Sequence, residues 1–498
     1  MRSRLSLLPG LLALVLVPCG PGVAWAQSRT QSISTGLDTR LGYNVNSRLG
    51  GREGAEWIGE FTPSISLQSR SGRVQGSLDY GLTLLQRSEQ EPSSDTLNRL
   101  AARLSAEAVP RHLYLEGSAS VAQQSSSPFG LQSASASVSD NPNRTEVATA
   151  TLSPVLRGVI GGAITAEARL TASAVNTRGT LVGDNTRTGG SLALSSFVPG
   201  TLINWGLRAE STETDFRIGR TTRTDVVNAS LGWQADADLS LSLRGGSETQ
   251  NVAELQSQRT NTWGVGANWR PSPRTRLQLN LDDRYFGRGY SLLAEYRLPR
   301  TSFVWSSGRD TSNGGGGTVE PLTLYQQLMA VLATDIPDPV ARDAAVRAEL
   351  ARQGVDPLAV VRPGFVLTSV SLSERHQFSW AWSGQRLSFS AQANRSLTTG
   401  LDIALSEIER EPIRQTGYSA NLAYRLSPTS SVAASGSRQM TRATSTQAAN
   451  DLKSASLSYT EQIGRRTNAS LSARYTVFNS TIDPYREAAL TASLVMRF

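Results

Sequence analysis

Thiol and imidazole side chains are almost absent from this chain of 498 residues, which has one cysteine, Cys19, and two histidines, His112 and His376. Cys19 precedes the expected cleavage site of a signal peptide, so the mature chain has no thiol. This excludes a disulfide framework, a thiolate metal site and a cysteine nucleophile. Two histidines leave little material for a zinc site. We therefore expect neither a metal nor any other cofactor.

Lysine and long apolar runs are also scarce. Lys453 is the single lysine, so arginine supplies nearly all of the positive charge behind the net charge of +8. No later stretch approaches the ~18 apolar residues that a membrane-spanning helix needs. A basic chain can bind nucleic acid, but these arginines are spread along the sequence without a nucleic-acid motif. A hydrated surface of mixed charge is the favoured interpretation, and we expect no nucleic-acid partner.

The N-terminus has the pattern of a secretory signal peptide over residues 1–26. Two arginines within the first four residues form its basic region, an apolar run follows over residues 5–17, and Ala-Trp-Ala at 24–26 is a small-x-small cleavage pattern. Cleavage there makes Gln27 the first residue of the mature chain. Cys19 leaves a lipoprotein signal open as an alternative. Either signal predicts export from the cytoplasm.

After the signal peptide, apolar residues recur at every second position to the end of the chain, a period that predicts β-strands. In residues 164–172, for example, Ile, Ala and Leu occupy the even positions, while Thr165, Glu167 and Arg169 occupy odd ones. A soluble sandwich buries such an apolar face, whereas a membrane barrel turns it to lipid.

Three features favour the membrane barrel. The alternating segments run to about 10–14 residues, the length of a tilted strand that crosses a bilayer. Short turns, such as 70–71 and 271–272, alternate with longer polar loops, such as 125–143 and 441–451. Following the alternation gives about 22 strands, an even number that places both ends on the periplasmic side. We therefore predict an all-β fold: a transmembrane antiparallel β-barrel over residues 27–498, in the outer membrane of a Gram-negative bacterium, with membrane lipid as a partner.

The last strand has the most specific pattern. Apolar residues alternate from Ala488 onward and end with Leu494, Met496 and Phe498. A terminal aromatic residue in this register resembles the signal by which outer-membrane barrels are recognised for assembly. We therefore expect the barrel assembly machinery to be a second partner.

Residues 312–364 depart from the strand pattern. Glycines at 314–317 lack the Lys-Ser or Lys-Thr of a phosphate-binding loop and are interpreted as a hinge. Two stretches with helical spacing follow, the second with Asp338-Pro339 at its start. By the strand count this insertion leaves from the external side. It could form a small helical hairpin outside the barrel, or a constriction that folds into the lumen.

Arginine on the polar register of the strands is the most informative residue type for function. The lumen candidates are Arg103, Arg169, Arg208, Arg276, Arg284, Arg297, Arg425 and Arg474. Acidic residues, among them Glu116, Glu167, Glu210 and Asp282, share that register. One interpretation is a hydrated wall of cross-strand ion pairs, each contributing little. The other is a mildly positive lumen that favours anionic solutes, including an anionic polysaccharide.

The histidines and the aromatic residues give a weaker signal. His376 shares the outward register of Phe378, and His112 starts a strand at the periplasmic side, so we expect no shared site, no catalytic residues and no enzymatic activity. Aromatic residues near strand ends favour anchoring at lipid headgroups over stacking on carbohydrate. They are Trp57, Trp205, Trp233, Trp263, Trp269, Tyr285, Trp380, Trp382 and Phe498.

Residues 291–310 (SLLAEYRLPRTSFVWSSGRD), the helical insertion, and residues 368–396 with their Ser-Glu-Arg-His-Gln core resemble one known family. This is the outer-membrane β-barrel family associated with PEP-CTERM and exosortase systems, and the resemblance covers nearly the whole mature chain. It implies a role beside exopolysaccharide biosynthesis and carries over no catalytic residues. The expected function is a channel or conduit linked to exopolysaccharide export. The alternative is a scaffolding barrel that binds surface polysaccharide or a periplasmic export partner.

Overall fold

The computed structural model describes residues 30–47, 53–88, 94–134, 141–179, 183–196, 202–312, 369–408 and 410–498, with short stretches between 318 and 367. The predicted signal peptide and the glycines at 314–317 lie outside the described residues. No helix in the described part of the chain is long and apolar enough to cross a membrane.

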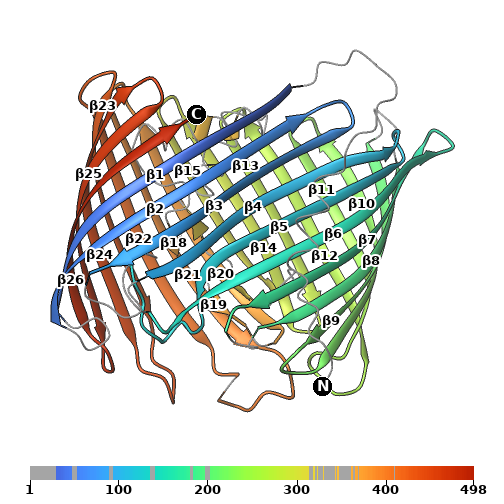
Figure 1. Cartoon of the computed structure of the whole chain (residues 1–498). Helices are drawn as coiled ribbons and strands as arrows, with labels where there is room; N and C mark the ends of the chain where they lie inside the picture. The colour runs from blue at the N-terminus through green and yellow to red at the C-terminus, as the bar shows by residue number, and fades with distance from the viewer. Residues whose placement is uncertain are drawn as a thin grey trace, which may run out of the picture.

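Antiparallel strands form a closed wall (Figure 1). The wall has 22 strands, which confirms the predicted fold class and strand number. Its strands are β1 (Thr30–Ser47), β2 (Glu53–Arg70), β3 (Val74–Arg87), β4 (Ser94–Val109), β5 (Leu113–Ser125), β6 (Arg144–Ile160), β7 (Ile164–Thr177), β8 (Asn185–Ser196), β9 (Ile203–Phe216), β10 (Thr221–Asp236), β11 (Leu239–Gln250), β12 (Gln258–Ser272), β13 (Thr275–Arg284), β14 (Gly287–Leu298), β15 (Thr301–Thr311), β20 (Ser371–Ser383), β21 (Leu387–Gly400), β22 (Ile413–Arg425), β23 (Ser430–Thr441), β24 (Asn450–Gly464), β25 (Thr467–Ser480) and β26 (Tyr485–Arg497).

The first and last strands close the barrel. β1 pairs with β26 from Gly36 opposite Arg497 to Asn46 opposite Glu487. The backbone N–H of Phe498 extends this pairing by donating to the carbonyl of Thr35 at 2.8 Å. Because the wall has no free edge, its backbone hydrogen bonds are satisfied from strand to strand, which a lipid environment requires.

Apolar side chains cover the outside of the wall. Leu170, Leu243 and Phe498 are 64%, 58% and 63% exposed, although each is a large apolar residue. Their strand neighbours of opposite parity point into the barrel, as the pleat of a β-strand requires. An apolar outer surface on a closed antiparallel barrel is the architecture of outer-membrane proteins, so the chain is an outer-membrane β-barrel.

Short and long connections lie at opposite ends of the wall. Tight turns such as Gly161–Gly162, both with positive φ, join strands at the end where β1 begins and β26 ends. Two residues with positive φ form the type of turn whose twist matches that of the flanking strands. Longer loops gather at the other end, in orange and red at the bottom of Figure 1. In outer-membrane barrels the short turns are periplasmic, so the long loops are external.

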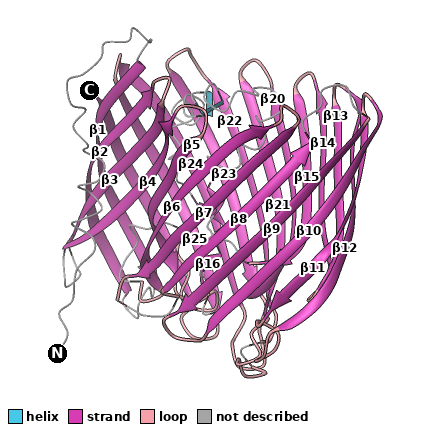
Figure 2. Ribbon diagram, turned by 90° about the vertical axis from the view of Figure 1, so that its right-hand side faces the viewer, coloured by secondary structure: helices cyan, strands magenta, loops and turns pink. Residues whose placement is uncertain are grey.

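The insertion between β15 and β20 contributes short elements. β16 (Thr318–Val319) pairs with β19 (Phe365–Val366), and β17 (Leu322–Thr323) pairs with β18 (Val360–Arg362). Helical residues in cyan in Figure 2 lie toward the end of the wall that holds the C-terminus. The described helical residues are Met329, Arg342, Asp343, Ala345 and Val346; the remainder of both predicted helical stretches lies outside the described residues.

Candidate functional site

The external mouth of the barrel is crossed by the loop between β5 and β6. Leu131 of this loop is buried in a cluster with Tyr485 of β26. The hydroxyl of Tyr485 donates to the carbonyl of Gln132 at 2.7 Å, and the side-chain amide of Asn450 donates to the carbonyl of Pro128 at 2.9 Å. Hydrogen bonds therefore hold this loop against β24 and β26, which lie beyond the β1–β26 pairing that closes the barrel.

A second segment, which we call the strap, consists of residues 365–367 and 369–371. Val366 is buried in a cluster with Val147 of β6. Val370 is buried with Phe216, the last residue of β9. Because the strap starts beside β5 and joins β20, it has to pass over the lumen to make both contacts. Its described residues therefore lie inside the external mouth. Whether residues 312–364 form an outer hairpin or a constriction stays a prediction.

The loop between β21 and β22 crosses from the same side as the strap. Asp402 is 3% exposed, and its carboxylate lies 2.7 Å from Nε of Arg220, which precedes β10. The Arg220 guanidinium also donates to the carbonyl of Val252 at 2.8 Å. The backbone N–H of Leu401 donates to the carbonyl of Val370, which joins this loop to the strap. Since most other polar groups of such loops face water, a buried ion pair here fixes the loop in one position.

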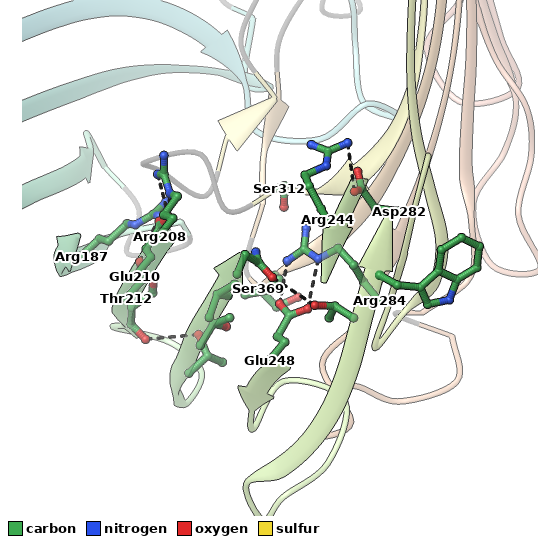
Figure 3. A pocket seen from close by; sticks show the side chains of 18 of the residues that line it. Arg187, Arg208, Glu210, Thr212, Arg244, Glu248, Asp282, Arg284, Ser312 and Ser369 are labelled. Carbon is green, nitrogen blue, oxygen red and sulfur yellow. Dashed lines mark hydrogen bonds and ion pairs between the residues drawn. The ribbon is translucent and has the colours of Figure 1, made fainter. Parts of the chain in front are cut away.

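A cavity of about 310 Å³ lies between the strap and the inner wall of β8–β13. Figure 3 shows Arg187 and Arg208 on one side of it, Arg244 and Arg284 on the other, with Ser312 and Ser369 between them. Hydroxyl groups supply much of the remaining polar lining, from Thr212, Thr214, Thr222, Thr224, Thr262, Ser312 and Ser369.

Four guanidinium groups line this cavity with three carboxylates, and the pairs are well defined. The ion pairs are Arg208–Glu210 at 2.8 Å, Arg244–Asp282 at 3.2 Å and Arg284–Glu248 at 2.6 Å. Arg187 differs, because its guanidinium makes only a long hydrogen bond of 3.5 Å to the hydroxyl of Thr212 among the described residues. No carboxylate of the described residues lies within ion-pair distance of its guanidinium. Among the described residues, Arg187 is therefore the guanidinium of this cavity without an ion pair, although the charge of Glu210 still acts on it across the lumen wall.

A second group of charged side chains lies near the periplasmic end of the lumen. Glu116 of β5 pairs with Arg169 at 2.8 Å and with Arg157 at 3.2 Å, and Arg157 pairs with Glu167 at 2.9 Å. These residues lie on three consecutive strands, so the pairs join neighbouring strands across the wall. Here positive and negative groups are balanced.

The arginines predicted to line the lumen all alternate with outward-facing residues of their strands, which places them on the inner side. Arg208 and Arg284 line the cavity, Arg169 joins the periplasmic pairs, and Arg474 pairs with the fully buried Glu487 at 2.6 Å. Arg103, Arg276, Arg297 and Arg425 lie elsewhere on the inner wall. Their role in passage stays a prediction.

Sequence reasoning missed Arg187 and Arg244, which complete the cavity lining. Both occur in the same polar register as the arginines that it selected. Arg187 is followed by Thr-Gly-Gly and Arg244 by Gly-Gly, so the apolar alternation weakens there. The inward direction of both arginines could still have been predicted from the clearer alternation in the rest of each strand.

Aromatic residues predicted to anchor in the headgroups face outward, except for Tyr285. Trp57, Trp233 and Trp263 are more than half exposed on the outer surface, in keeping with headgroup anchoring. Tyr285, by contrast, packs against the buried cluster around Val370, and burial raises the pKa of its hydroxyl. The prediction for Tyr285 is wrong because this residue belongs to the turn after β13, where strand alternation no longer sets the side-chain direction.

The two histidines lie at opposite ends of the wall. Nδ1 of His112, in the turn between β4 and β5, is 3.3 Å from the carbonyl of Arg157. His376 on β20 faces outward and contacts Ser307 of β15 and Glu374 of its own strand. Sequence reasoning missed Ser307, because it lies on another strand and becomes the neighbour of His376 only through the β15–β20 pairing. In the described part of the chain, no group of three or more His, Cys, Asp or Glu side chains could hold a metal ion.

No family model and no curated protein matches the chain. Among solved structures, it is similar to the FrpB iron transporter (F3-3 variant) of Neisseria meningitidis, with 10% identity and a TM-score of 0.49 over 93% of this chain and 81% of that one. The siderophore receptor PirA of Pseudomonas aeruginosa has 8% identity and a TM-score of 0.45 over 94% and 80%. OpdK of Pseudomonas aeruginosa, solved with vanillate, has 9% identity and a TM-score of 0.34 over 94% and 99%. At these identities the similarity concerns the fold alone.

Proposed function

We propose that this barrel is a channel or conduit for an anionic, hydroxylated solute, linked to exopolysaccharide export. The observation that carries the proposal is the luminal cavity in which Arg187 has no carboxylate partner among the described residues, although its neighbours are paired. A guanidinium kept without a carboxylate is available to a carboxylate or phosphate of the solute. The surrounding threonine and serine hydroxyls can bind the hydroxyls of a sugar.

The size of the barrel supports passage. A wall of 22 strands encloses more space than its own side chains fill, and barrels of this size hold plugging segments in the lumen. Here the strap and two loops occupy the external mouth. These segments narrow the passage without closing it, so we expect a low but measurable conductance.

A second candidate is a scaffolding barrel that binds surface polysaccharide or a periplasmic export partner. It is favoured by the ties across the mouth, above all the buried Arg220–Asp402 ion pair at 2.7 Å. Breaking a buried pair by removing one partner typically costs about 3–5 kcal/mol. A mouth held closed by such contacts is compatible with loops that serve only as a binding surface.

Current through the refolded protein in a planar lipid bilayer separates the two. The channel proposal predicts ion current with a preference for anions, and block of that current by an oligosaccharide that carries carboxylates. Arg187→Gln should weaken the block about tenfold, since a charged hydrogen bond contributes about 1.5 kcal/mol. Arg103→Gln, which changes a luminal arginine outside the cavity, is the matched control.

A silent wild-type barrel that still retains the anionic oligosaccharide on a column would contradict the channel and support the scaffold. Equal block of the current in the wild type and in Arg187→Gln would contradict a role of this cavity in binding the solute.

A further inference from the structure

Three polar side chains meet on the outer surface of β15 and β20, where apolar residues are expected. Nδ1 of His376 lies 2.8 Å from the hydroxyl oxygen of Ser307, and Nε2 lies 3.0 Å from a carboxylate oxygen of Glu374. Ser307 is directly opposite His376 in the pairing of the two strands. The three residues therefore form a continuous chain from hydroxyl to imidazole to carboxylate.

The order of these hydrogen bonds gives each group a chemical role. With the proton on Nε2, the imidazole donates to Glu374, and Nδ1 is left to accept the hydroxyl proton of Ser307. A hydroxyl bonded to a base, with the base oriented by a third group, is the arrangement that activates a serine for attack on a carbonyl carbon. The carboxylate also stabilises the imidazolium that forms when His376 takes the proton.

The cluster faces the membrane. Trp305 and Phe378, which flank it toward the periplasm on the same face, are 46% and 44% exposed. The side chains of His376 and Glu374 are 38% and 34% exposed, and Ser307, at 8%, lies beneath the imidazole ring. The cluster is therefore open toward lipid through its imidazole and carboxylate.

Its depth corresponds to the upper boundary of the membrane. β15 ends at Thr311 and β20 begins at Ser371, both at the external end and close to the cluster. Charged side chains on the lipid face of a barrel cost about 2–4 kcal/mol at the bilayer midplane and about 0–1 kcal/mol near the interface. A Glu–His pair is thus tolerated only at the level of the headgroups and ester bonds of the outer leaflet.

Two arginines flank the cluster on the same outward register. Arg309 of β15 is opposite Glu374, and Arg395 of β21 is opposite His376. The Arg309 guanidinium is held in place by the carbonyl of Arg288 and by the ring of Phe286. Guanidinium groups at this depth bind the phosphates of lipid headgroups. A lipid seated there would place its acyl chains along Trp305 and Phe378.

We propose that Ser307 and His376 are the catalytic residues of a site that cleaves ester bonds of phosphorylated lipids in the outer leaflet, with Glu374 as a positioning residue. This activity is separate from transport through the lumen, and it would add an enzymatic function that the sequence did not predict. The Ser307 oxygen attacks the ester carbonyl carbon while its proton passes to Nδ1 of His376. The ester C–O bond then breaks, and His376 returns the proton to the departing alcohol. Water hydrolyses the acyl-serine by the same route and releases the fatty acid.

The first test uses a fluorophosphonate, which labels activated serines covalently and needs no knowledge of the natural lipid. Barrel refolded in detergent micelles should be modified at Ser307, as located by mass spectrometry of its peptides. Ser307→Ala should abolish labelling, and His376→Gln should slow it at least about 100-fold, the size of a general-base contribution. Ser306→Ala, which removes a hydroxyl of the inner face of the same strand, is the matched control and should label like the wild type.

The second test measures release of fatty acid from phospholipid in mixed micelles. Ser307→Ala and His376→Gln should lose it, and Glu374→Gln should reduce it, whereas Glu374→Asp should restore part of the rate because a carboxylate is present again. A purely structural role for Glu374 would not distinguish the two variants. The shift in electrophoretic mobility on heating verifies that each variant has formed the barrel.

A folded wild-type barrel that is neither labelled nor active overturns the proposal, as does labelling of Ser307 that is unchanged in His376→Gln. Because bilayer current does not depend on this outer-surface site, loss of one activity without the other distinguishes the two proposals of this chain.

Discussion

The ion pairs of the lumen differ in how deeply their charged side chains are buried. Glu248 is fully buried beside Arg284, which it contacts at 2.6 Å. Glu210 contacts Arg208 at 2.8 Å, but that arginine side chain is 60% exposed. Water screens the second pair more than the first, so similar distances do not imply equal contributions to stability.

Glu248→Gln should therefore lower the free energy of unfolding by about 2 kcal/mol, because it leaves a buried guanidinium with a poorer acceptor. Asp310, 2.8 Å from Arg284, keeps part of the charge compensated. Glu210→Gln is the control and should cost less than about 1 kcal/mol. Urea unfolding of the barrel in lipid vesicles measures both; similar values would show that burial does not set the strength of these pairs.

Glu411 provides a pH-dependent contact between two external loops. Its carboxylate accepts hydrogen bonds from the backbone N–H and the hydroxyl of Ser445, and these bonds lower the pKa of Glu411 below its usual value of 4.5. A lowered pKa in the folded state means that the contact is complete above the usual pKa. It is lost as the pH falls through the lowered value.

On acidification, we expect the NMR shift of the Ser445 amide proton to change with a midpoint below pH 4.5. The shift should be insensitive to pH in Glu411→Gln, which cannot titrate. A midpoint of this shift above the usual carboxyl pKa would contradict the proposed hydrogen bonds between Glu411 and Ser445.

At the scale of elements, the strap is held by a close approach to the wall. A Cβ atom at Gly183 would lie 1.9 Å from Cγ1 of Val366, and Gly183 has a φ of +88°. Val366 cannot easily yield, because its branched side chain is stiff and is packed against Val147. Only glycine lets the wall and the strap come this close.

Gly183→Ala should accordingly displace the strap and raise the single-channel conductance in planar bilayers. Gly179→Ala is a matched control, because Gly179 has a φ of +80° and a Cβ there would meet nothing within 4 Å. Both substitutions carry a backbone cost of about 1–2 kcal/mol, so a difference between them reports the collision alone. Equal conductance in the two variants would mean that the strap does not obstruct the lumen.

At the scale of the whole molecule, closure depends on the last strand. β26 pairs with both β25 and β1, and Phe498, which follows it, is 63% exposed on the outer surface. A side chain so exposed packs against little protein, so its removal should barely change the stability of the formed barrel. The role of Phe498 in an assembly signal stays a prediction.

Phe498→Ala should reduce the amount of folded barrel in the outer membrane of cells several-fold, while the same variant refolded in detergent should unfold at nearly the urea concentration of the wild type. Tyr475→Ala, which removes an outward aromatic residue 48% exposed on β25, should affect neither. Folded protein is measured by the mobility shift on heating. An equal loss in cells for both variants would count against an assembly signal in Leu494, Met496 and Phe498.

The amino-acid sequence by itself determined the wall of this protein. Side chains of a strand alternate between two faces, so the period of two predicted the strands, their outward and inward residues and the number 22. Short turns between long strands fixed which end is periplasmic. These properties are local, because each depends on residues within one hairpin.

Only the tertiary structure decided what occupies the lumen and which strands meet across the insertion. The strap and the loops reach strands far from them in sequence, and no periodicity encodes such contacts; Tyr285 and the cavity around Arg187 depend on them. Ser307 faces His376 because β15 pairs with β20 across residues 312–370. Alternation predicts the face of the sheet on which each residue lies, but not which residue of a neighbouring strand is opposite it. That register is set by hydrogen bonds between strands that are distant in the sequence.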